Sequence, residues 1–228
     1  MAANLRNRIL ALRESIADAC GRVGRTPESV RVVVVTKTHP AETLQAVIDA
    51  GIRDIGENRV QEIVEKAPVL SGERVLHMVG HLQTNKVLKV VPLVDWIQSL
   101  DSERLLRKIE SSCENAAKTI NALVQVNTSG EDTKSGCEPG EALDLCEKVA
   151  ASNSVRFRGL MTIGPLDADE TDTRKAFTTL RTLGEKCRHL TESVELSMGM
   201  SGDFEWAIEE GATIIRVASL LLGQRPYP

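Results

Sequence analysis

Eight short strand-like runs, of which the first is the most continuous in apolar and β-branched residues, alternate along this chain with segments of helical periodicity. The runs lie at residues 31–36, 53–56, 74–79, 93–98, 121–127, 155–161, 193–197 and 213–217. Apolar runs without polar alternation indicate strands that are buried on both faces, as in a parallel sheet. Eight strand–helix units predict an α/β fold, a single (β/α)8 TIM barrel over residues 1–228 with an extra N-terminal helix at 3–22. A doubly wound sheet is the alternative that the same alternation leaves open.

Local helix signals agree with this alternation. Gly51 and Gly211 each follow a segment of helical periodicity, at the position where a left-handed C-cap favours glycine. Residues 101–103 (Asp-Ser-Glu) and 138–141 (Glu-Pro-Gly-Glu) have the composition of helix starts after the fourth and fifth strands. No Gly/Ser-rich or Pro-rich linker divides the chain, and no GxGxxG motif follows a strand. The sequence therefore predicts one domain without a dinucleotide fingerprint.

The overall composition excludes several classes of function. The net charge is −4 and aromatic residues make up 3% of the chain, which provides neither the basic surface nor the stacking platform that nucleic acid requires. No apolar run approaches the roughly 20 residues that span a bilayer, and the N-terminal segment lacks a signal-peptide core. The five cysteines are scattered without CxxC spacing, which favours free thiols over disulfides or a zinc site. We therefore expect a cytoplasmic protein without nucleic-acid or membrane partners.

Lys37 stands at the end of the first predicted strand. Residues 32–35 are four consecutive valines, and Lys37 follows one residue after them. Pro40 and Glu42 then have the residue preferences of the first turn of a helix. Because barrels bind their ligands at the carboxyl ends of the strands, Lys37 is a candidate for chemistry, and an ordinary surface lysine is the alternative.

The loops after the seventh and eighth predicted strands are rich in small residues. Residues 197–202 read Ser-Met-Gly-Met-Ser-Gly, and residues 218–219 read Ala-Ser. In barrels these two loops form a recurring phosphate site, because small residues let backbone N–H groups and hydroxyls converge on an anion. A lysine such as Lys37 across the barrel mouth is the arrangement expected for a Schiff base with a phosphorylated aldehyde. A tight turn without a ligand is the alternative for residues 197–202.

Six sequence blocks resemble the pyridoxal phosphate homeostasis protein family. They lie, in the family's order, at residues 36–38, 56–62, 80–86, 125–127 with 134–136, 158–161 and 196–201. The resemblance implies a barrel similar to the N-terminal domain of alanine racemase, with pyridoxal 5′-phosphate held on Lys37 as a Schiff base. It also implies a role in the supply and balance of the vitamin B6 cofactor, without established catalytic turnover. Apo forms of enzymes that use pyridoxal phosphate are then the candidate protein partners.

The resemblance also implies the residues of the cofactor site. Arg216 corresponds to the family's residue against the pyridine nitrogen, Asn58 to one that lines the ring, and Ser201 with the backbone of 218–219 to the phosphate site. The predicted cofactor-binding set is Lys37, Asn58, His81, Ser197, Met200, Ser201, Arg216, Ala218 and Ser219. Alternatives are a carboxylate partner for Arg216 and a helix-capping role for Asn58. The family commonly has Arg-x-Gly-Thr where this chain has Arg-Val-Ala-Ser at 216–219, which puts phosphate affinity in question.

The same residues argue against strong catalysis. A carboxylate that keeps the pyridine nitrogen protonated best supports carbanion chemistry on pyridoxal phosphate, and Arg216 cannot accept a proton. A racemase also needs an acid/base on each face of the substrate carbon, and the sole tyrosine, Tyr227, stands one residue from the terminus. We therefore predict a monomeric cofactor-binding protein that is not an enzyme. A weak fold-type-III amino-acid racemase and a class I aldolase that uses Lys37 are the alternatives.

No metal site is predicted. His77 and His81 have the i, i+4 spacing of a helical zinc motif, but the residues between them indicate the end of a strand. No glutamate follows His77, as it would in the metalloprotease motif. The two histidines are therefore not expected to bind one ion together.

Overall fold

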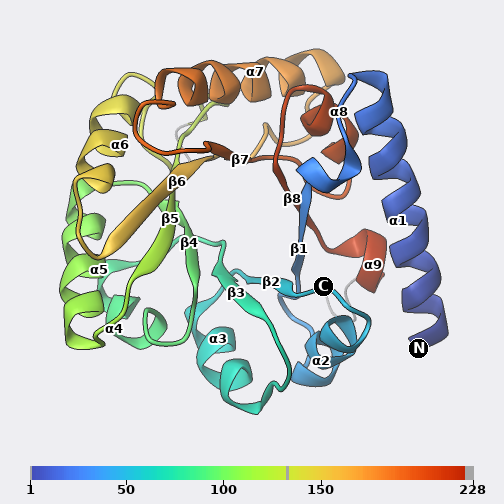
Figure 1. Ribbon diagram of the computed structural model, residues 1–228, viewed down its shortest axis with the longest axis horizontal. Helices are drawn as coiled ribbons and strands as arrows, with labels where there is room; N and C mark the ends of the chain where they lie inside the picture. The colour runs from blue at the N-terminus through green and yellow to red at the C-terminus, as the bar shows by residue number, and fades with distance from the viewer. Residues whose placement is uncertain (1, 132–133, 224–228) are drawn as a thin grey trace.

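The computed structural model describes residues 2–131 and 134–223, and its strands form a closed parallel barrel. The strands are β1 (Arg31–Val35), β2 (Asp54–Glu57), β3 (Val75–Met78), β4 (Trp96–Leu100), β5 (Ile120–Gln125), β6 (Val155–Met161), β7 (Glu195–Ser197) and β8 (Ile214–Val217). Each strand pairs with its sequence neighbours, and β1 pairs with β8 to close the ring (Figure 1). The predicted α/β barrel is confirmed, and this closure excludes the doubly wound sheet.

Helices surround the barrel on its outside (Figure 1). They are α1 (Ala2–Arg22), α2 (Ala41–Asp49), α3 (Val60–Lys66), α4 (Val87–Val90), α5 (Glu103–Asn115), α6 (Ala142–Ala150), α7 (Glu170–Lys186), α8 (Phe204–Glu209) and α9 (Ser219–Leu222). The predicted N-terminal helix is α1, which precedes the strand–helix units and packs beside α8 and α9. Across the described part of the chain, no helix has the length and apolar character needed to cross a membrane.

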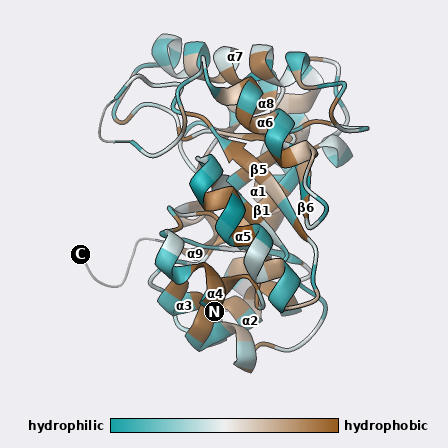
Figure 2. Cartoon of the chain, turned by 90° about the vertical axis from the view of Figure 1, so that its left-hand side faces the viewer, coloured by the Kyte–Doolittle hydropathy of each residue, from teal (hydrophilic) through white to brown (hydrophobic). Residues whose placement is uncertain are grey.

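Successive residues of a strand face two different apolar layers. The layer inside the barrel consists of Val33, Trp96, Leu123, Met161 and Ile214. Val34, the next residue of β1, points outward into the larger core between strands and helices. Figure 2 shows the strands mostly in brown, enclosed by helices that carry hydrophilic residues in teal. Burial on both faces explains why a strand such as β1 is a nearly continuous apolar run in the sequence.

The observed elements differ from the predicted ranges in ways that local hydrogen bonding explains. The sequence predicts a fourth strand at 93–98, whereas β4 begins at Trp96. The N–H groups of residues 93 and 94 donate to the carbonyl of Val90 in a helical turn, so these residues are not available to the sheet. Residues 138–141 form a turn, and α6 begins only after them, at Ala142.

Three predicted helix boundaries are confirmed by their caps. Ser102 is the N-cap of α5, and its Oγ accepts a hydrogen bond from the N–H of Leu105 at 3.4 Å. Gly51 and Gly211 have φ values of 89° and 99°, the left-handed conformation expected of a glycine C-cap. The sequence signals at these helix ends therefore act through the expected local geometry.

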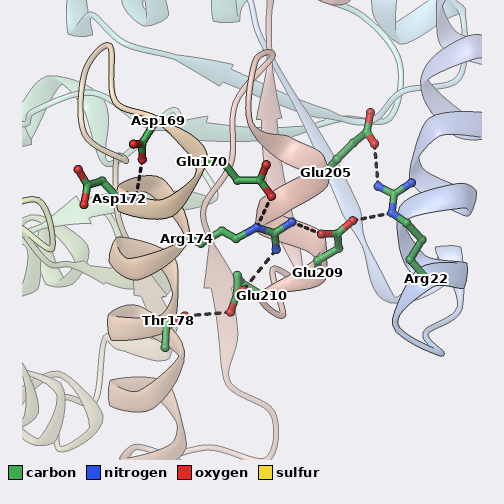
Figure 3. Close-up of polar contacts among 9 residues, drawn as sticks. All are labelled: Arg22, Asp169, Glu170, Asp172, Arg174, Thr178, Glu205, Glu209 and Glu210. Atoms are coloured by element: carbon green, nitrogen blue, oxygen red, sulfur yellow. Dashed lines mark hydrogen bonds and ion pairs between the residues drawn. The ribbon is translucent and has the colours of Figure 1, made fainter.

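An ion-pair network joins α1, α7 and α8 outside the barrel (Figure 3). Arg174 contacts Glu170, Glu209 and Glu210, and Arg22 contacts Glu205 and Glu209. The hydrogen bond from Arg174 lowers the pKa of Glu209, which both arginines share. Single exposed ion pairs contribute little to the stability of the fold, whereas a network of shared charges fixes the helices that it joins relative to one another. Since α8 directly follows residues 200–203, the network anchors one wall of the site described next.

Candidate functional site

The carboxyl ends of the strands surround a cavity of about 400 Å³. Seven of the nine predicted cofactor-binding residues line it: Lys37, Asn58, Met200, Ser201, Arg216, Ala218 and Ser219. Two other hollows, of about 470 and 590 Å³, lie against α1 and contain neither Lys37 nor Arg216. Residues from β1, β2, β7 and β8 therefore meet at one place, although they are far apart in the sequence.

A buried network of charges holds the turn that carries Lys37. Lys66 Nζ lies 2.8 Å from Glu57 Oε1 and 2.5 Å from Glu62 Oε2. Thr36 Oγ1 donates to Glu57 Oε1 at 2.7 Å, and the N–H of Thr38 donates to Glu62 Oε2 at 2.9 Å. Thr38 has a φ of 67°, a left-handed conformation that is uncommon for a non-glycine residue. The residues on both sides of Lys37 are thus fixed by carboxylates that Lys66 pairs.

Two titratable groups of this region have shifted pKa values. Burial raises the pKa of Glu57, and the hydrogen bonds from Lys66 and Thr36 oppose that shift. Burial also lowers the pKa of His39, and the positive charge of Lys66 lowers it further. The His39 ring is therefore neutral at pH 7 where it lines the cavity.

Small residues form the opposite side of the cavity. The N–H of Ala218 donates to Ser201 Oγ at 3.1 Å, which joins the loop after β7 to the loop after β8. The N–H of Met200 donates to Asp203 Oδ1 at 2.5 Å and closes the first loop. Ser219 is exposed at the start of α9. With these two N–H groups engaged, this side offers a ligand the hydroxyls of Ser201 and Ser219.

Arg216 reaches the cavity from inside the barrel. Its Nη1 donates to Ser197 Oγ at 2.6 Å and its Nη2 donates to the carbonyl of Thr162 at 2.7 Å. Burial lowers the pKa of Arg216 to about 10, so the guanidinium is still charged at pH 7. Because a guanidinium has five N–H donors, these two bonds leave donors for a ligand in the cavity.

The loops after β2 and β3 form a further part of the cavity wall, where two backbone segments come into close contact. A Cβ added to Gly80 would lie 2.2 Å from the carbonyl oxygen of Asn58, so a larger residue cannot occupy this position without moving the wall. Asn58 Oδ1 is buried and has no hydrogen-bond partner among the described residues. Buried polar atoms normally have partners, and a ligand group in the cavity would supply this one.

Two of the predicted residues do not line the cavity. His81 is exposed on the loop after β3, with its Nδ1 3.5 Å from Asp101 Oδ2. Ser197 is fully buried below the cavity, where it accepts the bond from Arg216. His77 points into the barrel and bonds to Asp54. No group of three His, Cys, Asp or Glu side chains suited to a metal ion occurs in the part of the chain that the structure describes.

Sequence reasoning missed several residues of the site. His39 lines the cavity two residues after Lys37, and its place in the same strand-end loop was the available signal. Val35, Val79 and Ile163 provide apolar surface, but nothing in their sequence context separates them from core residues. Lys66 was also missed, because its position beneath the turn depends on how α3 packs.

Comparisons with known proteins agree with this architecture. A family model described as alanine racemase, N-terminal domain, matches residues 10–226. The pyridoxal phosphate homeostasis protein of Aquifex aeolicus is 38% identical over 227 residues, which are 98% of this chain and 100% of that protein. The structure of PipY from Synechococcus elongatus with PLP bound has a TM-score of 0.84 and 32% identity, covering 96% of this chain and 100% of that chain.

A more distant similarity concerns the fold alone. Alanine racemase of Clostridium difficile has a TM-score of 0.80 at 14% identity, and the match covers 98% of this chain and 57% of the racemase. The barrel is therefore shared with one part of a longer protein. The similarity that extends over the full length, at 38% identity, is with the pyridoxal phosphate homeostasis protein of Aquifex aeolicus. This chain belongs to the pyridoxal phosphate homeostasis protein family.

Proposed function

We propose that this protein binds pyridoxal 5′-phosphate in the cavity at the carboxyl ends of the strands and serves the homeostasis of that cofactor. The observation that carries the proposal is the convergence of Lys37, Arg216 and the two serine-bearing loops on one cavity of about 400 Å³. PipY, 32% identical, is a family member described with PLP bound. The unpartnered Oδ1 of Asn58 supports the same conclusion, since it is a polar atom prepared for a ligand.

Lys37 is the proposed point of covalent attachment. Its amine would hold the cofactor through a Schiff base with the cofactor aldehyde, whose oxygen would leave as one water molecule. When bound, the cofactor supplies an aldehyde carbon for this reversible bond and an aromatic ring that accepts electron density. The charged network of Glu57, Glu62 and Lys66 holds the residues before and after Lys37, which fixes where its side chain leaves the backbone.

The serine loops are the proposed phosphate site. Ser201 Oγ already accepts from the N–H of Ala218, so its own proton is available to a phosphate oxygen. Ser219 adds a second hydroxyl at the start of α9. Ala218 has a φ of −133°, outside the left-handed region that favours glycine. The position therefore does not need the family's glycine for a positive φ.

A role without catalytic turnover follows from the proton chemistry of the site. Arg216 is charged at pH 7 and can only donate to the ring nitrogen, which leaves the ring a weak electron sink. His39 and Lys37 both belong to the loop after β1, so these two groups reach the cavity from the same strand end. We propose a monomeric cofactor carrier in a reducing compartment, where the five buried cysteines are free thiols.

Borohydride reduction followed by peptide mapping tests the attachment point. The wild-type protein incubated with pyridoxal phosphate should acquire one pyridoxyl label, on Lys37. Lys37→Ala should lose the label and the visible absorption band while keeping the thermal unfolding temperature of the apo protein. Lys89→Ala, at an exposed position on α4, is the matched control and should bind like wild type. A label on any other lysine contradicts the proposal.

A second experiment separates a carrier from a racemase. The loaded protein is incubated with L- and D-alanine in heavy water, and deuterium at the α-carbon is measured by mass spectrometry. The proposal expects no steady incorporation over long incubation, and transfer of the cofactor to an added apoenzyme. Sustained incorporation that Lys37→Ala abolishes would establish an enzyme instead.

A further inference from the structure

Five polar side chains form a continuous series of hydrogen bonds through the barrel interior below the cavity. Arg216 Nη1 lies 2.6 Å from Ser197 Oγ, which lies 2.7 Å from Gln98 Oε1. Gln98 Nε2 lies 3.0 Å from His77 Nδ1. His77 Nε2 lies 3.1 Å from Asp54 Oδ1. We call these five residues the interior chain. It connects the cavity at β8 to the amino end of β2, where Asp54 stands.

The chemistry of the side chains fixes the direction of each bond. Arg216 can only donate, so Ser197 Oγ accepts from it and directs its own proton to Gln98 Oε1. The amide nitrogen of Gln98 can only donate, so Nδ1 of His77 is an acceptor without a proton. Burial lowers the pKa of His77, and the single proton of the neutral ring therefore lies on Nε2, toward Asp54.

The reversed orientation of the Gln98 amide is unfavourable at both of its ends. It would require a proton on His77 Nδ1, which would set an unprotonated Nε2 against the carboxylate of Asp54. It would also direct the amide NH₂ to Ser197 Oγ, which would leave the Ser197 hydroxyl proton without Gln98 as its acceptor. His77 and Asp54 therefore fix the amide, and the amide fixes the hydroxyl that Arg216 contacts.

The place of this chain in the molecule indicates a purpose beyond stability. Barrel interiors are filled mainly by apolar side chains, and here the chain passes beside Trp96, on which His77 stacks at 5.5 Å between ring centroids. A buried polar network rigidifies its surroundings when every member is satisfied, and is unfavourable when one is not. Of its five members, Arg216 alone lines the cavity. The effect of the chain on a ligand must therefore pass through Arg216.

We propose that His77 and Gln98 are positioning residues, which hold the Arg216 guanidinium in the orientation that meets the ring of the bound cofactor. The inference rests on the proposed function, because it concerns the same site. Without His77, the Gln98 amide is free to rotate and the Ser197 hydroxyl loses its fixed acceptor. The guanidinium then loses a directed partner at Nη1, and its remaining donors are no longer aimed at one point in the cavity.

Three substitutions of His77 separate its two hydrogen-bonding atoms. In His77→Asn, the amide oxygen takes the place of Nδ1 and still accepts from Gln98. In His77→Gln, the amide nitrogen takes the place of Nε2 and still donates to Asp54. His77→Phe keeps the stacking on Trp96 and neither polar atom. The proposal expects Asn to retain most of the function, and Gln and Phe to lose it.

Cofactor affinity and the visible absorption band of the bound cofactor are the measured quantities. His77→Phe should weaken pyridoxal phosphate binding about tenfold, which corresponds to ~1.4 kcal/mol, and should shift the band. Gln98→Leu should have at least the same effect, because it interrupts the chain nearer to Arg216. His77→Asn should remain within about twofold of wild type. Equal affinities and spectra for wild type and His77→Phe overturn the proposal.

A double-mutant cycle tests whether the effect passes through Arg216. Arg216→Lys keeps a positive charge but removes the planar guanidinium that Ser197 orients. In that background His77→Phe should change affinity by less than about twofold. If His77→Phe lowers the affinity about tenfold both in the wild-type background and in the Arg216→Lys background, His77 has a general structural role, and the proposal is overturned.

Two further measurements separate this inference from folding and from the proposed function. Leu123→Val is a control for stability, because it removes a methylene from the same interior layer without altering the interior chain. It should lower the thermal stability about as much as His77→Phe does and leave the absorption band of the bound cofactor unchanged. ¹⁵N NMR of the apo protein should show the His77 ring protonated on Nε2 only.

The failure of this inference and the failure of the proposed function give different results. If the wild-type protein binds no pyridoxal phosphate, the proposed function itself fails. If the wild-type protein binds it and the His77 variants bind it equally well, this inference alone fails.

Discussion

The two sides of the cavity are built from different interactions. We call residues 36–38 with Glu57, Glu62 and Lys66 the lysine side, and residues 200–202 with 218–219 the serine side. On the lysine side, the paired charges of Lys66 and the two carboxylates fix the backbone. The loops of the serine side are joined by one bond, from the Ala218 N–H to Ser201 Oγ.

The difference follows from what each side has to do. A reversible covalent bond needs an amine that points in one direction, and the left-handed Thr38 beside it needs support from its surroundings. An anion needs several donors that remain accessible, which short side chains and backbone N–H groups provide. A buried ion pair is weak evidence for stability, so we interpret the charges of the lysine side as a device for geometry. The serine side achieves its geometry through small residues.

The largest expected effect comes from removing the central charge of the lysine side. Lys66→Met leaves Glu57 buried without its partner and should lower the free energy of unfolding by ~3–5 kcal/mol. Chemical denaturation of the apo protein measures this loss. Adding Glu57→Gln to Lys66→Met should restore more than half of it, since the unpaired charge is then gone. A loss below ~1 kcal/mol for Lys66→Met would show that the network is dispensable.

On the serine side, a single substitution should reduce binding more than it reduces stability, because the Ala218 N–H that loses its acceptor is only partly buried. Ser201→Ala removes a hydroxyl that we propose donates to the phosphate, and hydrogen bonds to charged groups are worth ~2 kcal/mol, or roughly 30-fold in affinity. Titration with pyridoxal phosphate measures the loss. Pyridoxal, which lacks the phosphate, is the control ligand and should bind wild type and variant equally. An equal loss for both ligands would place Ser201 outside the phosphate site.

How far the sequence predicts this site depends on the side. The alternation of apolar runs was enough to place Lys37 at the end of a strand, whereas Arg216, inside the predicted run at 213–217, was assigned to the site by the family resemblance. Ser201 and Ser219 follow from the same rule and from the small residues around them. Lys66 could not be placed, because its role depends on the rotation of α3 against the Lys37 turn.

The interior chain was equally hidden in the sequence. His77 and Gln98 are on β3 and β4, where a polar residue inside an apolar run gives no sign of its partner. Only the closed barrel brings Gln98 to Ser197, which is 99 residues away in the chain. His81 illustrates the reverse case, since a resemblance assigned it to the site and the structure places it on an exposed loop.

A smaller effect should distinguish the sides by their pH dependence. Burial and the charge of Lys66 lower the pKa of His39, so the folded state binds a proton less readily than the unfolded state, whose histidine titrates near ~6.5. This contribution to stability is present above that value and is lost as the pH falls below it. His39→Asn should therefore flatten the decline in the free energy of unfolding between about pH 7 and 5. Ser201→Ala should follow the wild-type profile, and identical profiles for all three proteins would contradict the assignment.

The smallest effect is expected where this chain departs from the family's common sequence. Ala218 has a φ of −133°, outside the left-handed region that favours glycine, so the position does not need a glycine for a positive φ. We expect pyridoxal phosphate affinity within about twofold of wild type, and a slight loss of stability, ~0.5–1 kcal/mol, from the freer unfolded chain. Parallel ligand titrations and denaturation curves measure the two quantities. A large gain in affinity would mean that the alanine side chain obstructs the phosphate, and the serine side would then be a weakened site. Unchanged affinity would show that the serine side depends on its hydroxyl donors, whichever small residue stands at position 218.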